Sequence, residues 1–202
     1  MREHGSGEAP SAATRRQRGI HVRIGNISPE ATGTYEVRRN VIEPALIDDA
    51  LRILHVDLLS RGATAEQLSE WLWAAHWFPH LNYEPQILAL ADALPADWRT
   101  GERCDPQILL QFPQVGPAPD ITFHLDEEPA WAGNKRYRRI VGVPLSPWSQ
   151  ANGGLLVKHG ESAEPVELEP GDAVAMSPDL PHSGGINTTG AIRYGIYFRW
   201  LQ

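Results

Sequence analysis

The sequence has only one cysteine among its 202 residues, and no apolar run approaches the roughly 18 residues of a membrane span. A single thiol excludes an internal disulfide, and the first eighteen residues lack the apolar segment of a secretory signal. These absences predict a protein of the reducing cytoplasm without a membrane segment. The cysteine itself, Cys104, could be a packed thiol or a nucleophile, but no base stands near it to favour the second interpretation.

Positive charge is scarce as well, with 18 lysines and arginines against 25 aspartates and glutamates and a formal net charge of -7. An acidic surface repels phosphate backbones, so we expect no nucleic-acid partner. The sequence also lacks a basic cluster that could hold the phosphates of coenzyme A. The expected partner is therefore a small molecule, such as an amino-acid derivative or a natural-product intermediate. The oligomeric state is left open.

The expected secondary structure changes from mostly helical to mostly β near residue 105. Residues 1–18 are expected to form a flexible leader, and residues 19–105 a mostly helical support region. Thr64 and Gln67 form a capping box for the second of three helical segments. The expected helices span residues 44–60, 64–79 and 85–94, and short strands are expected at residues 20–27 and 34–42, on either side of a turn.

Residues 106–202 contain short β-rich runs separated by glycine, proline, asparagine and aspartate. Six or more short strands at this spacing are typical of an all-β sandwich or barrel such as a jelly roll. We therefore expect a mainly β fold with flanking helices, forming a single domain over residues 19–202. The expected strands are residues 108–112, 121–125, 137–145, 154–159, 173–177 and 192–200.

The candidate chemistry begins with a His-Leu-Asp sequence inside one of these strands. Alternate side chains of a strand share a face, so His124 and Asp126 project the same way. His182, further along the chain, is the candidate for a third ligand. Two imidazoles and one carboxylate on one face of an octahedron suit Fe(II) and leave positions for a cosubstrate and O2. Taken alone, a His-x-Asp pair is more often a histidine beside a solvated aspartate.

Arg193 strengthens the interpretation, because it follows His182 on the last expected strand. A guanidinium there can hold the distal carboxylate of 2-oxoglutarate in a bidentate pair, which lysine cannot match. Thr122 shares the face of His124 and could contact the oxoacid, or it could simply fill the barrel as a β-former. Gln111, on the preceding strand, is a further candidate for a cosubstrate contact.

Five motifs stand in a fixed order: His124-Leu125-Asp126, Asn152-Gly153-Gly154-Leu155-Leu156-Val157, Leu168-Glu169-Pro170-Gly171-Asp172, His182 and Arg193. In order and spacing they resemble the phytanoyl-CoA dioxygenase family of the Fe(II)- and 2-oxoglutarate-dependent oxygenases. The resemblance covers roughly residues 105–202. It implies a double-stranded β-helix, with iron as the metal, 2-oxoglutarate as the cosubstrate and O2 as the oxidant.

The resemblance has two departures and one informative agreement. Family members often carry a small hydroxyl residue two positions after the distal histidine, where this chain has Gly184, and Lys158-His159-Gly160 replaces the usual Gly-Ser-His. Halogenating relatives replace the carboxylate ligand by a small residue. Because Asp126 is present, the resemblance implies hydroxylation, or desaturation, cyclisation or epimerisation, rather than halogenation.

Several other polar residues are open to two interpretations. Arg139 and Trp148 are candidates for lining a substrate pocket, although the cationic run around Arg139 is more typical of a solvated edge strand that charge protects from pairing. His76 and His80 have the spacing of a helical metal pair, but Pro79 breaks the helix between them. Packing of this tryptophan-rich segment against the barrel is therefore the expected role.

Two alternative functions stay open. A cupin-type metalloprotein keeps the barrel, but it normally has a two-histidine cluster with a downstream glutamate where this chain has His124-Leu125-Asp126, and it has no role for Arg193. A non-catalytic binding protein on the same fold is the second alternative. An intact triad argues against it, because decayed sites lose their ligands first. Iron-dependent turnover of 2-oxoglutarate to succinate separates the three hypotheses.

Overall fold

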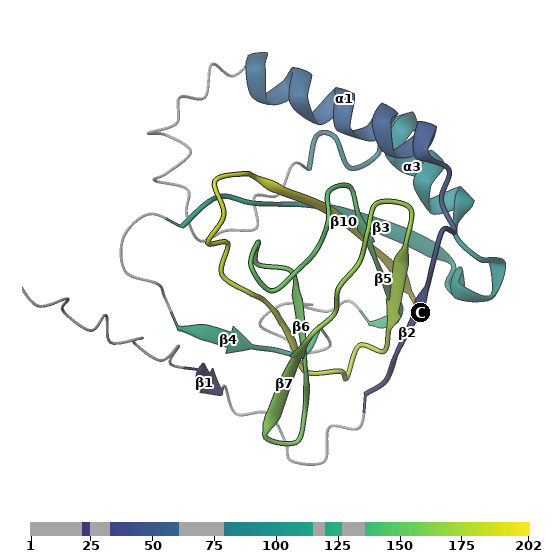
Figure 1. The fold of residues 1–202 in the computed structure, drawn as a ribbon. Helices are drawn as coiled ribbons and strands as arrows, with labels where there is room; N and C mark the ends of the chain where they lie inside the picture. Colours follow the sequence, from purple (N-terminus) through teal and green to yellow (C-terminus); the bar gives the residue numbers. More distant parts are fainter. Residues whose placement is uncertain (1–21, 25–32, 61–78, 115–119, 127–135) are drawn as a thin grey trace, which may run out of the picture.

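The computed structural model describes residues 22–24, 33–60, 79–114, 120–126 and 136–202 (Figure 1). Within these ranges the helices come early in the chain and most of the strands come late. The elements are β1 (Val22–Ile24), β2 (Tyr35–Arg38), α1 (Pro44–Ser60), α3 (Pro85–Ala93), the 3-10 helix η1 (Ala96–Trp98), β3 (Arg103–Gln111), β4 (Ile121–Phe123), β5 (Tyr137–Pro144), β6 (Leu155–His159), β7 (Ser162–Pro165), β8 (Ala173–Met176), β9 (His182–Gly184) and β10 (Arg193–Leu201).

Five strands form the larger sheet, in the order β2-β8-β5-β10-β3. All neighbouring strands in it are antiparallel. β10 pairs along its whole length with β3, from Arg193 opposite Gln111 to Leu201 opposite Arg103, and it pairs with β5 on its other side. β10 is therefore a central strand, fixed by hydrogen bonds from both neighbours.

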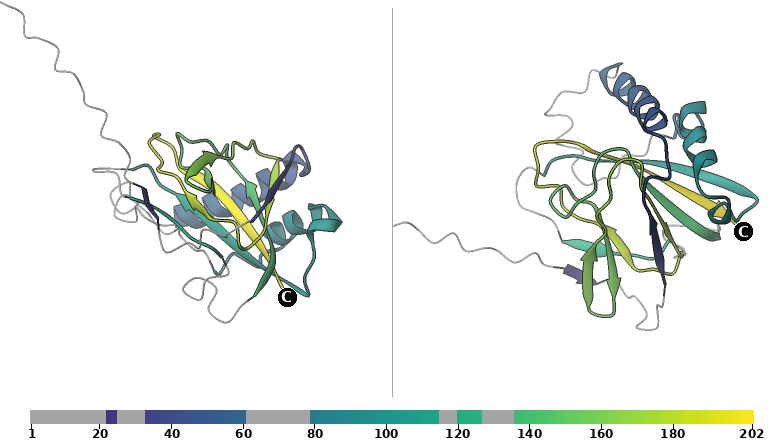
Figure 2. Two further views of the ribbon diagram at one scale, coloured as in Figure 1. Left: turned by 90° about the horizontal axis from the view of Figure 1, so that it is seen from below. Right: turned by 45° about the vertical axis from the view of Figure 1, so that its right-hand side comes forward.

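The smaller sheet contains β7, β6 and β9, again antiparallel. An isolated bridge between His124 and His182 joins the end of β4 to β9, and β4 also pairs in parallel with β1. The β6–β7 hairpin lies on the side of the molecule away from the helices (Figures 1 and 2). Two sheets with flanking helices confirm the predicted fold class, a mainly β protein built on a double-stranded β-helix.

The helices lie together over one face of the larger sheet (Figure 1). α1 begins at Pro44, where the missing N–H is not needed, and it buries Ile47, Ala50 and Leu54, which recur at the spacing of one helix face. α3 likewise begins at a proline, Pro85. No helix in the described ranges is long and apolar enough to cross a membrane.

Apolar side chains fill two layers, one on each face of the larger sheet. Burying such a side chain fully contributes roughly 1.5–3 kcal/mol, so both layers hold the sheet in place. Between the sheet and the helices lie Leu54, Leu90, Ile108, Leu110, Val141, Val143, Ile196 and Phe198. Between the two sheets lie Ile140, Trp148, Leu155, Val157, Leu168, Val174 and Met176. Successive residues of β10 therefore face the helices and the interior of the jelly roll in turn.

Most of the predicted elements are confirmed. α1 has the predicted bounds, α3 ends within one residue of them, and each of the six late strands is present. The helix expected at residues 64–79 lies almost wholly outside the described residues. β3 begins at Arg103 rather than at residue 108, and β7 and β9 were not predicted. The two early strands do not pair with each other, because β1 pairs with β4 and β2 with β8.

Candidate active site

The backbone of the smaller sheet brings two histidines together. The N–H of His124 donates to the carbonyl oxygen of His182 at 3.0 Å, and the N–H of His182 donates back to His124 at 3.1 Å. Residues that exchange both bonds across an antiparallel pair lie directly opposite each other, with their side chains on one face. The two imidazole rings accordingly lie with their centres 4.5 Å apart.

Asp126 completes a group of three. Its backbone N–H donates to the carbonyl oxygen of Pro178 at 3.1 Å, which fixes the chain just after β4. One carboxylate oxygen lies 3.7 Å from Nε2 of His124, and the other lies 3.7 Å from Nε2 of His182. A nitrogen from each ring and a carboxylate oxygen all lie within 4.8 Å of one another. The structure thus brings together three donor atoms of the types found in a 2-His-1-carboxylate iron site.

The backbone also orients the two rings. Nδ1 of His182 lies 2.9 Å from the carbonyl oxygen of Leu180, which makes Nδ1 the donor and leaves the lone pair of Nε2 for a metal. His124 has a hydrogen bond to the backbone of Thr122. Burial, and then the neighbouring His182, lower the pKa of His124, although Asp126 opposes this. Both effects favour the neutral imidazole, which is the form that binds metals.

Arg193, the first residue of β10, is only 2% exposed. Its Nε and Nη2 donate to Oε1 of Gln111 at 3.1 and 2.7 Å. The guanidinium carbon lies 5.2 Å from the ring centre of Trp148. Nη1 is buried and has no hydrogen-bond partner among the described residues. Burial lowers the pKa of Arg193, but a guanidinium starts so high that it stays charged.

Tyr197 connects this arginine with the triad. Burial is the main cause that raises the pKa of the Tyr197 phenol to about 12; the charge of Arg193 opposes the rise and the charge of Asp126 adds to it. The geometry agrees, because a methyl group on Gly184, two residues after His182 on β9, would lie 3.9 Å from Nη2 of Arg193. Arg193 and Asp126 face the same interior, one from the larger sheet and the other from beside the smaller sheet.

The donor set fits a divalent metal ion together with an anionic ligand. The triad offers two imidazoles and a carboxylate, and no described carboxylate pairs with Arg193. A buried cation without a counter-ion costs several kcal/mol, so an anion at its free Nη1 would offset that cost. The described residues therefore have room in their chemistry for a divalent metal ion at the triad and for an anionic group at Arg193.

Comparison with known proteins gives likeness in structure only. No model of a protein family matches the chain, and no curated protein is similar to it in sequence. The non-heme alpha ketoglutarate (2-oxoglutarate) dependent carbocyclase SnoK from nogalamycin biosynthesis matches 83% of this chain and 79% of its own, with 13% identity and a TM-score of 0.63. HygX from Streptomyces hygroscopicus was solved with nickel and 2-oxoglutarate bound. The match covers 82% of this chain and 81% of HygX, with 14% identity and a TM-score of 0.57. The non-heme alpha ketoglutarate dependent epimerase SnoN is also from nogalamycin biosynthesis. The match covers 82% of this chain and 76% of SnoN, with 17% identity and a TM-score of 0.54.

The chain has the fold of the 2-oxoglutarate-dependent oxygenases. The shared shape agrees with the resemblance carried by the sequence motifs. In this oxygenase fold the His-Asp-His triad lies where β4 ends and β9 begins.

The remaining predicted residues of the oxygenase fold lie in different places. Thr122 is exposed and precedes His124 on β4, on the same face by alternation. Trp148 is buried beside Arg193, and its Nε1 donates to the carbonyl oxygen of Tyr194 at 3.2 Å. Arg139 is not brought to this group. It lies opposite Trp200, on the helix-covered face of the larger sheet, where its charge acts on Asp97.

Cys104 and His80 lie on the helix side of the larger sheet, away from the triad. Cys104 packs against the helix-side core, and burial followed by the charge of Asp105 raises its pKa to about 12, which agrees with a packed thiol. Nε2 of His80 lies 3.0 Å from Oδ1 of Asp57 on α1. His76, the other half of the suggested helical pair, lies outside the described residues.

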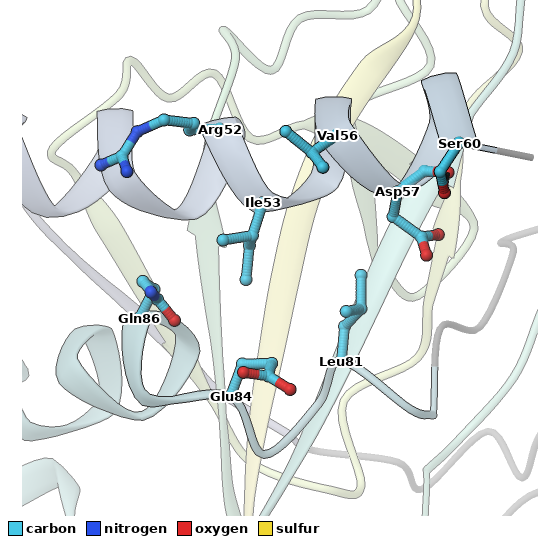
Figure 3. A pocket seen from close by; sticks show the side chains of 8 residues that line it. All are labelled: Arg52, Ile53, Val56, Asp57, Ser60, Leu81, Glu84 and Gln86. Carbon is cyan, nitrogen blue, oxygen red and sulfur yellow. Dashed lines mark hydrogen bonds between the residues drawn. The ribbon is translucent and has the colours of Figure 1, made fainter.

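A separate hollow of about 400 Å³ lies on the helix side of the oxygenase fold, between α1 and the segment that enters α3 (Figure 3). Ile53 and Val56 line it from α1, and Leu81 lines it from the opposite side (Figure 3). Its other lining residues are Arg52, Asp57, Ser60, Glu84 and Gln86. The larger sheet lies between this hollow and the triad, so the hollow is not part of the candidate site.

Tyr197 and Leu180 were missed in the sequence. Tyr197 was within reach of sequence reasoning, because it follows Arg193 by four positions and alternation places both on one face of the strand. Leu180 contributes only a backbone carbonyl oxygen, and that role leaves no signature in a side chain.

Proposed function

We propose that the protein is an Fe(II)- and 2-oxoglutarate-dependent oxygenase that acts on a small molecule. The observation that carries the proposal is a buried arginine, without a counter-ion among the described residues, that lies close to the strand β9 from which His182 of the His-Asp-His group projects. The shared fold of solved 2-oxoglutarate-dependent enzymes supports it. A cupin-type metalloprotein has no role for Arg193, and a non-catalytic descendant has no reason to keep the triad.

Each residue has a distinct task in this proposal. His124, Asp126 and His182 hold the metal, and the contact of His182 with Leu180 keeps its Nε2 directed at the metal. Arg193 binds the distal carboxylate of 2-oxoglutarate. When bound, Fe(II) supplies the activation of O2, coupled to conversion of 2-oxoglutarate to succinate and CO2 and to oxidation of an unactivated C–H bond.

The residues around Arg193 orient the oxoacid and exclude water. Trp148 and Tyr197 pack against each other with their ring centres 5.5 Å apart. Gly142 and Gly195 on neighbouring strands leave room for the indole ring of Trp148, because a methyl group would lie 2.4 Å from the ring if built on Gly195 and 3.0 Å from it if built on Gly142. A dry, rigid surrounding strengthens the pairing between Arg193 and a carboxylate, since the local dielectric is lower than in water.

Hydroxylation is the outcome we favour. Asp126 occupies the carboxylate position, which argues against halogenation. SnoK is named as a carbocyclase and SnoN as an epimerase, so proteins of this fold carry out more than one reaction. Both are named from nogalamycin biosynthesis, which supports a natural-product intermediate, or a similar small molecule, as the substrate class.

The proposal is tested by incubating the protein with Fe(II), 2-oxoglutarate and O2 and measuring succinate. We expect slow succinate formation without substrate, which accelerates with the correct small molecule. Arg193→Ala should raise the required 2-oxoglutarate concentration by about one to two orders of magnitude, because it removes hydrogen bonds of a charged group worth about 1.5–3 kcal/mol each. Arg52→Ala, which removes an exposed arginine of α1, is the matched control and should change nothing.

Two results would contradict the proposal. One is metal binding by the wild-type protein with no succinate formed, either alone or across a panel of candidate substrates, which favours a cupin-type or binding protein. The other is an unchanged 2-oxoglutarate requirement in Arg193→Ala, which would remove Arg193 from its role.

A further inference from the structure

Gln111 controls which part of the arginine is free. It lies directly opposite Arg193 in the ladder between β3 and β10. Its Oε1 accepts hydrogen bonds from both Nε and Nη2 of Arg193, at 3.1 and 2.7 Å. A guanidinium carries five N–H donors in a fixed, planar fork. With its Nε–Nη2 edge taken, Arg193 has Nη1 and the second hydrogen of Nη2 left, and Nη1 is the buried atom without a partner.

The carboxamide of Gln111 is itself held at its other end. Its Nε2 donates to the carbonyl oxygen of Gly185. A flipped amide would set its NH2 group against the donors of Arg193 and its oxygen against the oxygen of Gly185. Asn187 fixes the backbone as well, because its Nδ2 donates to the carbonyl oxygen of Gln111 at 3.0 Å. Gln111 can therefore present only its oxygen to the arginine.

The side-chain amide of Gln111 lies in a space that is left open by glycines, which have no side chain. Gly153 has a positive φ of 75°, and a methyl group on it would lie 2.5 Å from Nε2 of Gln111 and 2.6 Å from Cδ. A side chain at this position would push the amide off Arg193. A methyl group on Gly184 would lie 3.6 Å from Oε1 of Gln111, which is ordinary van der Waals contact. The Gly153 turn thus has a second role beside its backbone conformation.

The charge of residue 111 matters as much as its shape. A carboxamide occupies one edge of Arg193 without neutralising it. A glutamate in the same place would form a bidentate ion pair and would cancel the positive charge. With glutamine, the whole charge of the arginine stays available to a ligand.

We propose that Gln111 is a positioning residue that turns the Nη1–Nη2 edge of Arg193 toward the oxoacid and keeps its charge uncompensated. The site then selects 2-oxo acids with a second carboxylate over 2-oxo acids with an uncharged tail. This inference rests on the proposed function, because it assumes that an oxoacid binds between the triad and Arg193.

The test is isothermal titration of the Mn(II)-loaded protein, without O2, with 2-oxoglutarate and with 2-oxobutyrate, which has no second carboxylate. The wild-type protein should prefer 2-oxoglutarate by at least about tenfold. Gln111→Glu should weaken 2-oxoglutarate by about a hundredfold and leave 2-oxobutyrate unchanged, because only the charge at Arg193 is lost. Gln111→Met, with similar length but no acceptor, should weaken 2-oxoglutarate by about tenfold. Gln150→Glu, the same change at an exposed position, should have no effect.

A purely structural role for Gln111 would give a different pattern, since both oxoacids would then weaken together as the protein became less stable; that result overturns the inference. Gly153→Ala, which displaces the amide while keeping it, should reduce the preference for 2-oxoglutarate, and an unchanged preference also counts against Gln111. Equal affinity of the wild-type protein for the two oxoacids also overturns the inference. Failure of the wild-type protein to bind 2-oxoglutarate at all would instead overturn the proposed function.

Discussion

The two faces of β3 and β10 differ sharply although they are made by alternate residues of the same strands. On the helix side, Ile108, Ile196 and Phe198 are fully buried in an apolar layer. On the inner side, Gln111, Arg193 and Tyr197 supply an amide, a cation and a phenol. The strand backbone is common to both faces, so one face can stabilise the fold while the other carries polar groups that are costly to bury.

This difference predicts which mutations should change stability and which should change ligand binding. Changes on the helix side should act on the free energy of unfolding and leave the chemistry alone. Changes on the inner side should act on ligand binding and leave stability nearly unchanged. Each prediction below tests this separation at one residue.

His182→Ala should have the largest effect, the loss of metal binding and of all activity. It removes one of three metal donors on the inner side, and a metal held by two protein ligands binds far more weakly. Titration with Mn(II) or Fe(II) and the succinate assay measure both losses. His159→Ala, which removes an exposed histidine of the β6–β7 hairpin, is the matched control. Retained metal affinity in His182→Ala would take His182 out of the site.

Phe198→Ala should destabilise the protein by about 3–5 kcal/mol, because it leaves a cavity in the apolar layer beside Trp200. Urea unfolding measures this loss. The folded fraction should bind 2-oxoglutarate as tightly as the wild type does. A large change in that affinity would show that the two faces of the sheet are coupled.

Tyr197→Phe should have the smallest effect, a weakening of oxoacid binding by about 1 kcal/mol with unchanged stability. The hydroxyl has no hydrogen-bond partner among the described residues, so its removal leaves no described group unsatisfied. Because the pKa of the phenol is raised to about 12, it stays protonated, and the effect should be equal at about pH 7 and about pH 9. A pH-dependent effect would mean that the phenol ionises in the site.

The sequence predicted the elements whose signals are local. α1 and α3 have apolar residues at helical spacing and a proline at the first position, and these features do not depend on the rest of the fold. β7 and β9 were missed for the opposite reason. β9 has only His182, Ser183 and Gly184, and β7 is fully exposed, so neither carries an alternating apolar pattern.

In the candidate site, too, the residues with a local signal were predicted and the contacts that depend on the fold were not. His124 and Asp126 share a strand, so alternation alone suggested their pairing. The face of Arg139 was not readable, because β5 is apolar on both sides and its run gives no inner or outer signature. The contact of Gln111 with Gly153 joins residues far apart in the chain, and only the packed structure supplies it.

Under the proposed function, the uncompensated charge of Arg193 would couple the stability of the fold to the concentration of the oxoacid. A ligand that binds only the folded chain stabilises it, by about 2.7 kcal/mol at a hundred times its dissociation constant. An oxoacid that also relieves a buried charge should be such a ligand. If the protein has the proposed function, its lifetime in a cell would follow the supply of the oxoacid, and a shortage of this metabolite would lower the amount of protein as well as its activity.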